Sequence, residues 1–172
     1  MATIKFKGNP IHTSGELPKP GSKLVDFKLT KADLSETSPA DFKGKVLILN
    51  IVPSLDTGVC AASARTFNSR IKELGGAVVL TISRDLPFAQ KRFCEAEGID
   101  SVLMLSELRD RKFGEGYGAA MIDGPLAGLL SRAIIVADTT GKIVYTEQVP
   151  EIAQEPDYAK ALAAAKSAAT GY

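Results

Sequence analysis

The chain contains two cysteines, Cys60 and Cys94, and these are the residues best suited to chemistry. Two cysteines are too few for a disulfide framework, and with His12 as the only histidine they are also too few for a zinc site. A thiolate is nevertheless a strong nucleophile, and its oxidised forms can be reduced again. The two side chains therefore indicate nucleophilic or redox chemistry based on thiols.

Cys60 stands where a predicted buried strand gives way to a predicted helix. With Thr57 as the helix N-cap, Cys60 is the third helical residue, the position whose backbone N–H the cap side chain reaches. Unpaired N–H groups and the positive end of the helix dipole favour a thiolate there. The alternative is a small buried apolar residue, which is how most free cysteines behave. Position alone leaves these two interpretations evenly balanced.

The residues before Cys60 favour the chemical interpretation, because Pro53 fixes the chain entering the loop and Thr57 stands three residues before the sulfur. The spacing Pro-x-x-x-Thr-x-x-Cys resembles the active-site motif of the peroxiredoxins. The whole stretch 53–60, followed by Arg65-Thr66-Phe67-Asn68, resembles more narrowly the thiol peroxidase subfamily, the atypical two-cysteine peroxiredoxins. This resemblance extends over nearly the whole chain in element order and length.

The resemblance implies a division of labour at the site. Cys60 attacks the terminal oxygen of a hydroperoxide, Thr57 and backbone N–H groups hold the peroxide, and Pro53 shields the sulfur from bulk water. The family also uses an arginine from a later strand, and the matching position is Arg132, which opens the apolar run 132–138. The residues alone leave other arginines open for this role, namely Arg65, Arg70, Arg84 and Arg92.

Cys94 is the only other thiol that could condense with a sulfenic acid on Cys60. A plain core role is the alternative, because its segment carries an apolar helical stripe of Leu86, Phe88, Ala89, Phe93 and Ala96. The resemblance assigns Cys94 the resolving role and implies an intramolecular Cys60–Cys94 disulfide. A disulfide needs Cα atoms about 5.5–6 Å apart. We therefore expect the start of the first helix and part of the second to unwind on oxidation.

The function that the resemblance implies is thiol-dependent reduction of hydrogen peroxide and organic hydroperoxides. It further implies re-reduction by thioredoxin, a homodimer, and no metal, haem or flavin cofactor. A thiol-disulfide oxidoreductase is one rival, but that chemistry normally uses Cys-x-x-Cys, and here Thr57 stands three residues before Cys60. A second rival is a redox-sensing protein-binding module switched by the same disulfide.

The elements that position these residues alternate along the chain. Strands are predicted at residues 2–7, 11–13, 45–52, 77–83, 101–107, 132–138 and 143–149. Helices are predicted at residues 58–74, 86–97 and 157–169. This order predicts an α/β protein with a thioredoxin-like fold, in which helices flank a mixed central sheet and an N-terminal β-hairpin precedes it. We expect residues 1–172 to form a single domain.

The composition argues against several partner classes. Lys and Arg total 21 against 20 for Asp and Glu, giving a formal net charge of +1. Without long blocks of one sign, the chain is not expected to bind nucleic acid or an anionic membrane. Its apolar runs are far shorter than the roughly 20 residues of a bilayer span, and its first residues lack the apolar core of a secretory signal. We therefore expect a cytoplasmic protein.

Overall fold

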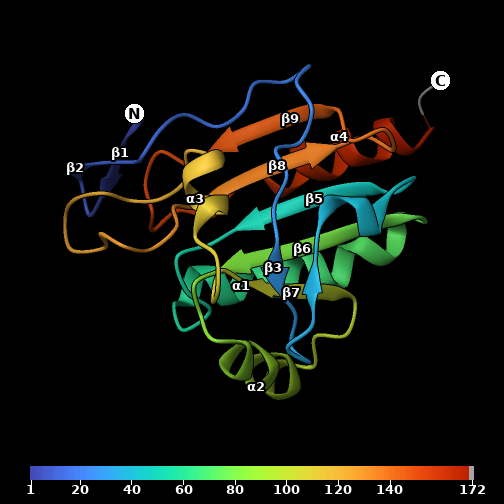
Figure 1. Ribbon diagram of the computed structural model, residues 1–172, viewed down its shortest axis with the longest axis horizontal. Coiled ribbons are helices and arrows are strands. Elements are labelled where there is room, and N and C mark those ends of the chain that lie inside the picture. The colour runs from blue at the N-terminus through green and yellow to red at the C-terminus, as the bar shows by residue number, and fades with distance from the viewer. Residues whose placement is uncertain (171–172) are drawn as a thin grey trace.

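A mixed sheet of seven strands forms the centre of the computed structural model, which describes residues 1–170 (Figure 1). The strands follow the spatial order β4-β3-β7-β6-β5-β8-β9. Their bounds are β3 (Leu29–Thr30), β4 (Glu36–Thr37), β5 (Val46–Ile51), β6 (Ala77–Ser83), β7 (Val102–Ser106), β8 (Ala133–Ala137) and β9 (Ile143–Gln148). Strands β5, β6 and β7 run parallel, whereas β8 and β9 run antiparallel to their neighbours. The predicted mixed sheet is confirmed.

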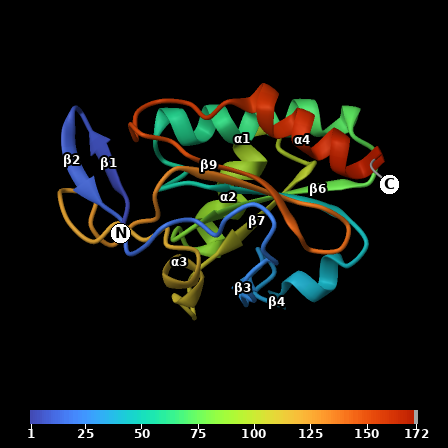
Figure 2. The same ribbon diagram turned by 90° about the horizontal axis from the view of Figure 1, so that it is seen from above.

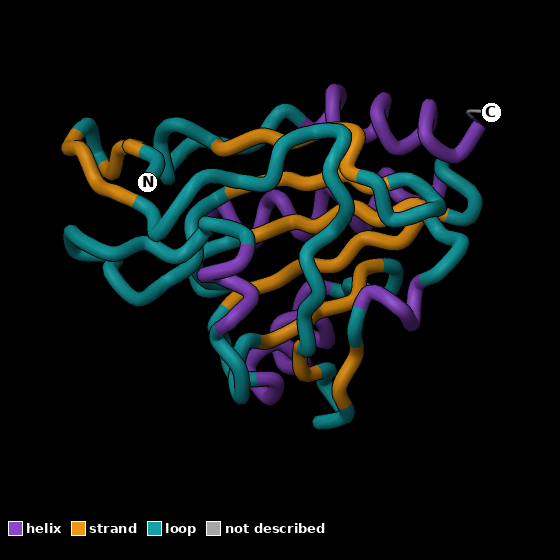
Figure 3. The backbone as a smooth tube through the Cα atoms, turned by 45° about the horizontal axis from the view of Figure 1, so that its top comes forward, coloured by secondary structure: helices purple, strands orange, loops and turns teal. Residues whose placement is uncertain are grey.

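Helices and loops cover both faces of the sheet, which is why β5 is apolar along most of its length and buried throughout. One face carries α1 (Gly58–Arg70) and α4 (Tyr158–Thr170), while α3 (Lys112–Gly116) lies on the other (Figure 2). Residues 13–28 cross that second face as an extended segment (Figure 3). Helix α2 (Pro87–Glu97) packs against β7. Two short 3₁₀ helices, η1 (Pro39–Phe42) and η2 (Ile71–Glu73), also lie among residues 1–170.

The N-terminal hairpin is also confirmed, and it joins β1 (Thr3–Phe6) to β2 (Asn9–His12). Both residues of its turn, Lys7 and Gly8, have positive φ angles, as a tight hairpin turn requires. The Glu151 carboxylate accepts hydrogen bonds from the two turn N–H groups, at 2.9 and 3.1 Å. The hairpin thereby attaches to the loop after β9, beside the sheet.

Four short elements among residues 1–170 have no counterpart in the sequence prediction, namely β3, β4, α3 and the 3₁₀ helix η1. Strands β3 and β4 contain two residues each, too few to show an alternating pattern, and α3 lies in a glycine-rich stretch of low helix propensity. The helix predicted for 58–74 ends instead at Arg70 and continues as the 3₁₀ turn η2. None of the helices within residues 1–170 has the length and apolar character needed to cross a membrane.

Candidate active site at the start of helix α1

Cys60 is the third residue of α1, as predicted, and its side chain is completely buried. The chain leaves β5 at Ile51 and crosses to α1 through a short loop at residues 52–57. Because β5 and β6 are parallel, their carboxyl ends share one edge of the sheet, where α/β proteins commonly place their sites. The fold thus holds a thiol at a helix N-terminus beside that edge.

Arg132 reaches the sulfur from a different strand. It immediately precedes β8, whose Ala133 pairs with Ile51 at the end of β5. Its Nη1 lies 3.2 Å from the Cys60 Sγ, and its Nε donates a 2.7 Å hydrogen bond to the Ile152 carbonyl. The arginine is only 2% exposed, and no carboxylate within residues 1–170 forms an ion pair with it. A permanent positive charge is therefore directed at the sulfur.

The other candidate arginines lie elsewhere. Arg65 pairs with Glu97 at 3.1 Å on the surface, and Arg84 pairs with the buried Glu107 at 2.7 Å. Arg92 is exposed on α2, and Arg70 lies in the last turn of α1, remote from Cys60 in the first. Sequence reasoning left these positions open because charge alone does not distinguish a surface arginine from a buried one.

Thr57 is the N-cap of α1, as predicted, but its side chain accepts no hydrogen bond from the Cys60 N–H, and that part of the prediction is wrong. Thr57 is exposed, and its hydroxyl donates a 2.9 Å hydrogen bond to the Ser54 carbonyl instead of accepting one from the helix. The physical reason is the tight turn at Ser54–Thr57, which brings that carbonyl within reach of the hydroxyl. Within residues 1–170 the backbone N–H of Cys60 has no hydrogen-bond acceptor. A donor at the sulfur's own residue is thus free to bind an incoming oxygen.

Pro53 is buried in the loop before Cys60, and Asp85 fixes that loop to the end of β6. The Asp85 carboxylate accepts hydrogen bonds from the Ser54 hydroxyl at 2.8 Å and from the Leu55 N–H at 2.9 Å. Sequence reasoning missed this residue. The available signal was its place after the second parallel strand, at the sheet edge that Cys60 also occupies. Asp85 therefore positions the chain that leads into Cys60.

Cys94 lies in the last part of α2 and is half-buried. It packs against the same hydrophobic cluster that contains Cys60, but both cysteines are free and no disulfide joins them. Burial, and to a smaller extent the charge of Glu95, raises the pKa of the Cys94 thiol. The structure thus places both thiols around one cluster, with Cys94 held as a thiol in this conformation.

The apolar stripe predicted on the second helix is divided between the core and the surface, because Phe93 packs against the cluster that contains Cys60. Leu86 is 52% exposed and Phe88 is 64% exposed, and the stripe lines an open hollow on the surface. Gln90 takes the inward position, where its Nε2 donates to the Leu105 carbonyl at 2.9 Å and to the Ser83 hydroxyl at 3.2 Å. A buried polar side chain bonded to the strands thus adds to the apolar contact that Phe93 makes with the core.

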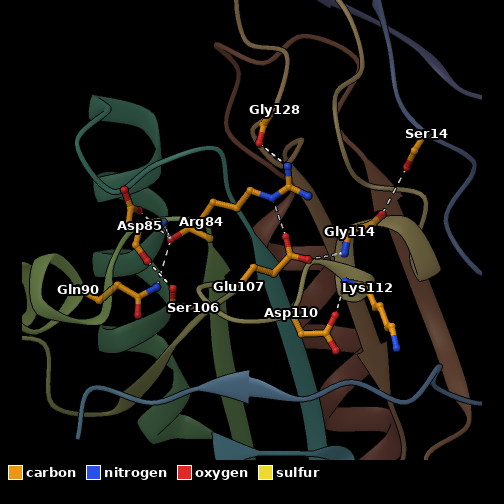
Figure 4. Close-up of polar contacts among 11 residues, drawn as sticks. Ser14, Arg84, Asp85, Gln90, Ser106, Glu107, Asp110, Lys112, Gly114 and Gly128 are labelled. Carbon is orange, nitrogen blue, oxygen red and sulfur yellow. Dashed lines mark hydrogen bonds and ion pairs between the residues drawn. The ribbon is translucent and has the colours of Figure 1, made fainter. Parts of the chain in front are cut away.

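A buried ion pair between Arg84 and Glu107 links the loops next to this edge of the sheet (Figure 4). Arg84 follows β6 and pairs with Glu107, while its Nη1 donates to the Gly128 carbonyl. The second Glu107 oxygen accepts a 2.7 Å bond from the Gly114 N–H in α3. Burial raises the pKa of Glu107, and its bonds to Arg84 and Gly114 act in the opposite direction. The pair ties the 113–130 region to the strands that end at the site.

No group of three or more His, Cys, Asp or Glu side chains in the described part of the chain could hold a metal ion. The chemistry that this geometry itself supports is that of a buried thiol with a cationic donor at 3.2 Å and a free backbone N–H beside it. Such an arrangement can bind an electronegative atom that approaches the sulfur and can stabilise negative charge that develops on it.

Comparison with known proteins shows consistent similarities. The Redoxin family matches residues 19–162. Thiol peroxidase from Mycobacterium tuberculosis (strain ATCC 25618 / H37Rv) is 56% identical over 164 residues, covering 95% of this chain and 98% of that protein. Thiol peroxidase from Corynebacterium glutamicum is 52% identical, with coverage of 95% and 99%.

Solved structures are similar in the arrangement of the chain. A peroxiredoxin-like protein from Aquifex aeolicus superposes with a TM-score of 0.91 at 37% identity, covering 97% of both chains. Thiol peroxidase from Chromobacterium violaceum gives a TM-score of 0.84 at 22% identity, covering 92% of this chain and 91% of that one, a likeness that concerns the fold alone. The predicted thioredoxin-like fold, with its added N-terminal hairpin, is confirmed.

Proposed function

Because this chain belongs to the Redoxin family and, within it, to the thiol peroxidases, we propose that Cys60 is the thiol with which it reduces hydroperoxides. Membership of this family supports a thiol-dependent peroxidase activity but does not say which cysteine reacts with the peroxide. The observation that carries the assignment to Cys60 is the 3.2 Å contact between its sulfur and the buried Arg132 guanidinium. Cys94, at a helix end and half-buried, has no arginine at its sulfur among the described residues.

The first step is attack of the Cys60 thiolate on the terminal oxygen of the hydroperoxide. A sulfur–oxygen bond forms, the oxygen–oxygen bond breaks, and the leaving oxygen takes up a proton as an alcohol or water. Cys60 becomes a sulfenic acid, oxidised by two electrons. Arg132 stabilises the sulfur and the negative charge that develops on the oxygens, and the free Cys60 N–H can hold the peroxide in line.

Pro53 and Thr57 keep the supporting roles that the resemblance implies, with one change for Thr57. Pro53 is buried in the loop at the site and shields the sulfur from water. Thr57 bonds to Ser54 in this structure, so its hydroxyl must turn away from that carbonyl before it contacts a peroxide. Rotation about one side-chain torsion is sufficient for such a change.

The second step joins the two cysteines, and the Cys94 sulfur acts as the resolving nucleophile. The shared cluster that contacts both residues supports this pairing. Both cysteines lie in helices, so a disulfide requires the start of α1 and part of α2 to unwind. Burial raises the pKa of Cys94 in the folded helix. When the helix unwinds and the thiol enters water, that effect is lost, and a larger fraction of Cys94 is present as the reactive thiolate.

Turnover requires a dithiol reductant, and we assign this part to a protein of the thioredoxin type. The family membership supports the assignment, and it equally supports a homodimer that works in the cytoplasm. The peroxide and the reductant are the two partners of the cycle, and residues 1–172 act as one catalytic domain.

Replacement of Cys94 by serine is expected to leave a single turnover. The Cys94→Ser protein should consume one equivalent of peroxide at the unmodified rate, and Cys60 should then remain a sulfenic acid or proceed to sulfinic acid. Intact-mass measurement after quenching, with a sulfenic-acid-specific label, follows this directly. Continued turnover with thioredoxin and its reductase would show that Cys94 is not the resolving residue.

A further inference from the structure

The residues that follow Cys60 in α1 contact the end of the helix that carries Cys94. The Arg65 Nη1 donates to the Glu97 carboxylate at 3.1 Å. One turn further along α1, the Asn68 Oδ1 accepts hydrogen bonds from the backbone N–H groups of Asp100, at 3.1 Å, and Ser101, at 2.7 Å. Helix α1 thus contacts the Cys94 segment through one ion pair and through two hydrogen bonds that the Asn68 side chain accepts from the backbone.

These two contacts fall on opposite sides of the end of α2. Glu97 is the last helical residue, and Gly98, with φ of 66°, ends the helix by donating to the Cys94 carbonyl. The Ile99 N–H donates to the same carbonyl at 2.9 Å. Unwinding around Cys94 breaks these bonds and displaces Glu97. The bonds to Asn68 lie beyond the helix and can persist.

The Ile99 side chain strengthens the attachment beyond the helix. It is buried in the same hydrophobic cluster as Cys60. On the other side of Cys94, the completely buried Gln90 is bonded to the strands β6 and β7. The stretch 91–98 therefore lies between two fixed points. A fully extended chain from Cys94 to Ile99 spans at most about 17 Å, so an anchored segment confines the thiol to this neighbourhood.

We propose that Asn68 is a positioning residue for the resolving step, an inference that rests on the proposed function. In that step the Cys94 sulfur attacks the sulfenic sulfur of Cys60. The sulfur–sulfur bond forms, the sulfur–oxygen bond breaks, and the oxygen leaves as water with the proton of the Cys94 thiol. Asn68 touches neither sulfur. It holds the chain after α2 against α1 while the helix unwinds, which keeps the concentration of Cys94 near Cys60 high.

Arg65 has the opposite effect in this scheme. Its ion pair with Glu97 stabilises the closed helix and must be broken before Cys94 can move. Both side chains are partly exposed, so the pair contributes only modestly to stability. Loss of the Asn68 bonds should therefore slow disulfide formation, whereas loss of the Arg65 pair should accelerate it. The two substitutions should thus change the rate of disulfide formation in opposite directions. This difference distinguishes a residue that anchors the chain after α2 from one that only stabilises the folded helix.

The test follows both steps in one time course. Reduced protein is mixed with excess hydrogen peroxide, quenched with a thiol-alkylating reagent, and resolved by mass into thiol, sulfenic and disulfide forms. For Asn68→Ala we expect disulfide formation about tenfold slower, with Cys60 oxidation unchanged and more sulfinic acid at high peroxide. Asn68→Asp keeps an acceptor oxygen and should recover the rate to within about twofold.

Two further variants complete the comparison. Lys72→Ala removes the exposed ion pair between Lys72 and Asp100 and leaves the Asn68 bonds intact, so both rates should stay unchanged. Arg65→Ala should accelerate disulfide formation by about twofold. If Asn68→Ala does not fold, Asn68→Gln, which displaces the same amide oxygen, takes its place. Equal or faster disulfide formation without the Asn68 acceptor would overturn the proposal. Failure of the proposed function is separate, because the unmodified protein itself would then form no Cys60–Cys94 disulfide.

Discussion

Peroxidase activity is expected to disappear when Cys60 is replaced by serine. A serine hydroxyl is not ionised near neutral pH and cannot form the sulfenic acid that carries the two electrons. Loss of the nucleophile should lower the rate of peroxide consumption by at least about 10³-fold. The measurement is the rate at which a thioredoxin system consumes peroxide in the presence of the Cys60→Ser protein, compared with the unmodified protein.

The fold should survive this substitution, since serine differs from cysteine by one atom. Thermal unfolding of both proteins checks this. The matched control is Cys94→Ser, which alters the other cysteine and should retain the first turnover. Substantial activity in a folded Cys60→Ser protein would show that the nucleophile has been assigned wrongly.

Removal of Arg132 is expected to have the second largest effect. Arg132→Ala deletes the cation at 3.2 Å from the sulfur and should slow oxidation of Cys60 by about 10²–10³-fold, as loss of a preorganised electrostatic donor does in other enzymes. Arg132→Lys keeps a charge but loses the planar group that bonds to both the sulfur and the Ile152 carbonyl, so only part of the rate should return. Single-turnover oxidation with hydrogen peroxide measures both variants.

Arg92→Ala is the matched control, because it removes an exposed arginine from the outer side of α2. Its rate of Cys60 oxidation should equal that of the unmodified protein. The Arg132→Ala protein also loses the bond to Ile152, so its unfolding must be measured alongside. A folded Arg132→Ala protein that reacts at the unmodified rate would transfer the electrostatic role to the free N–H groups of α1.

Long elements of the fold could be predicted because their signals are local. The runs that became β5, β6 and β8 each contain five apolar residues, and the helix start placed Cys60 at its third position. Short elements such as β3 and α3 are stabilised by contacts with the finished sheet instead. Their own residues carry too little pattern to reveal them.

Most residues of the site could be predicted from the sequence, but the contacts among them could not. The choice of Arg132 depended on family resemblance, because only the pairing of β8 with β5 brings it to the sulfur. The side-chain bond expected of the N-cap Thr57 does not form, because its hydroxyl donates to the Ser54 carbonyl three residues earlier. Asp85 was missed because its partners, Ser54 and Leu55, are about thirty residues away in sequence and are brought together by parallel strand pairing.

The central claim is that Cys60 and Cys94 together carry the electrons of peroxide reduction. The most direct measurement adds one equivalent of hydrogen peroxide to fully reduced protein, counts the remaining thiols, and maps any bridge by mass spectrometry. We predict rapid loss of both thiols and a Cys60–Cys94 link within one chain. Retention of the thiols, or a bridge between chains in its place, would contradict the account.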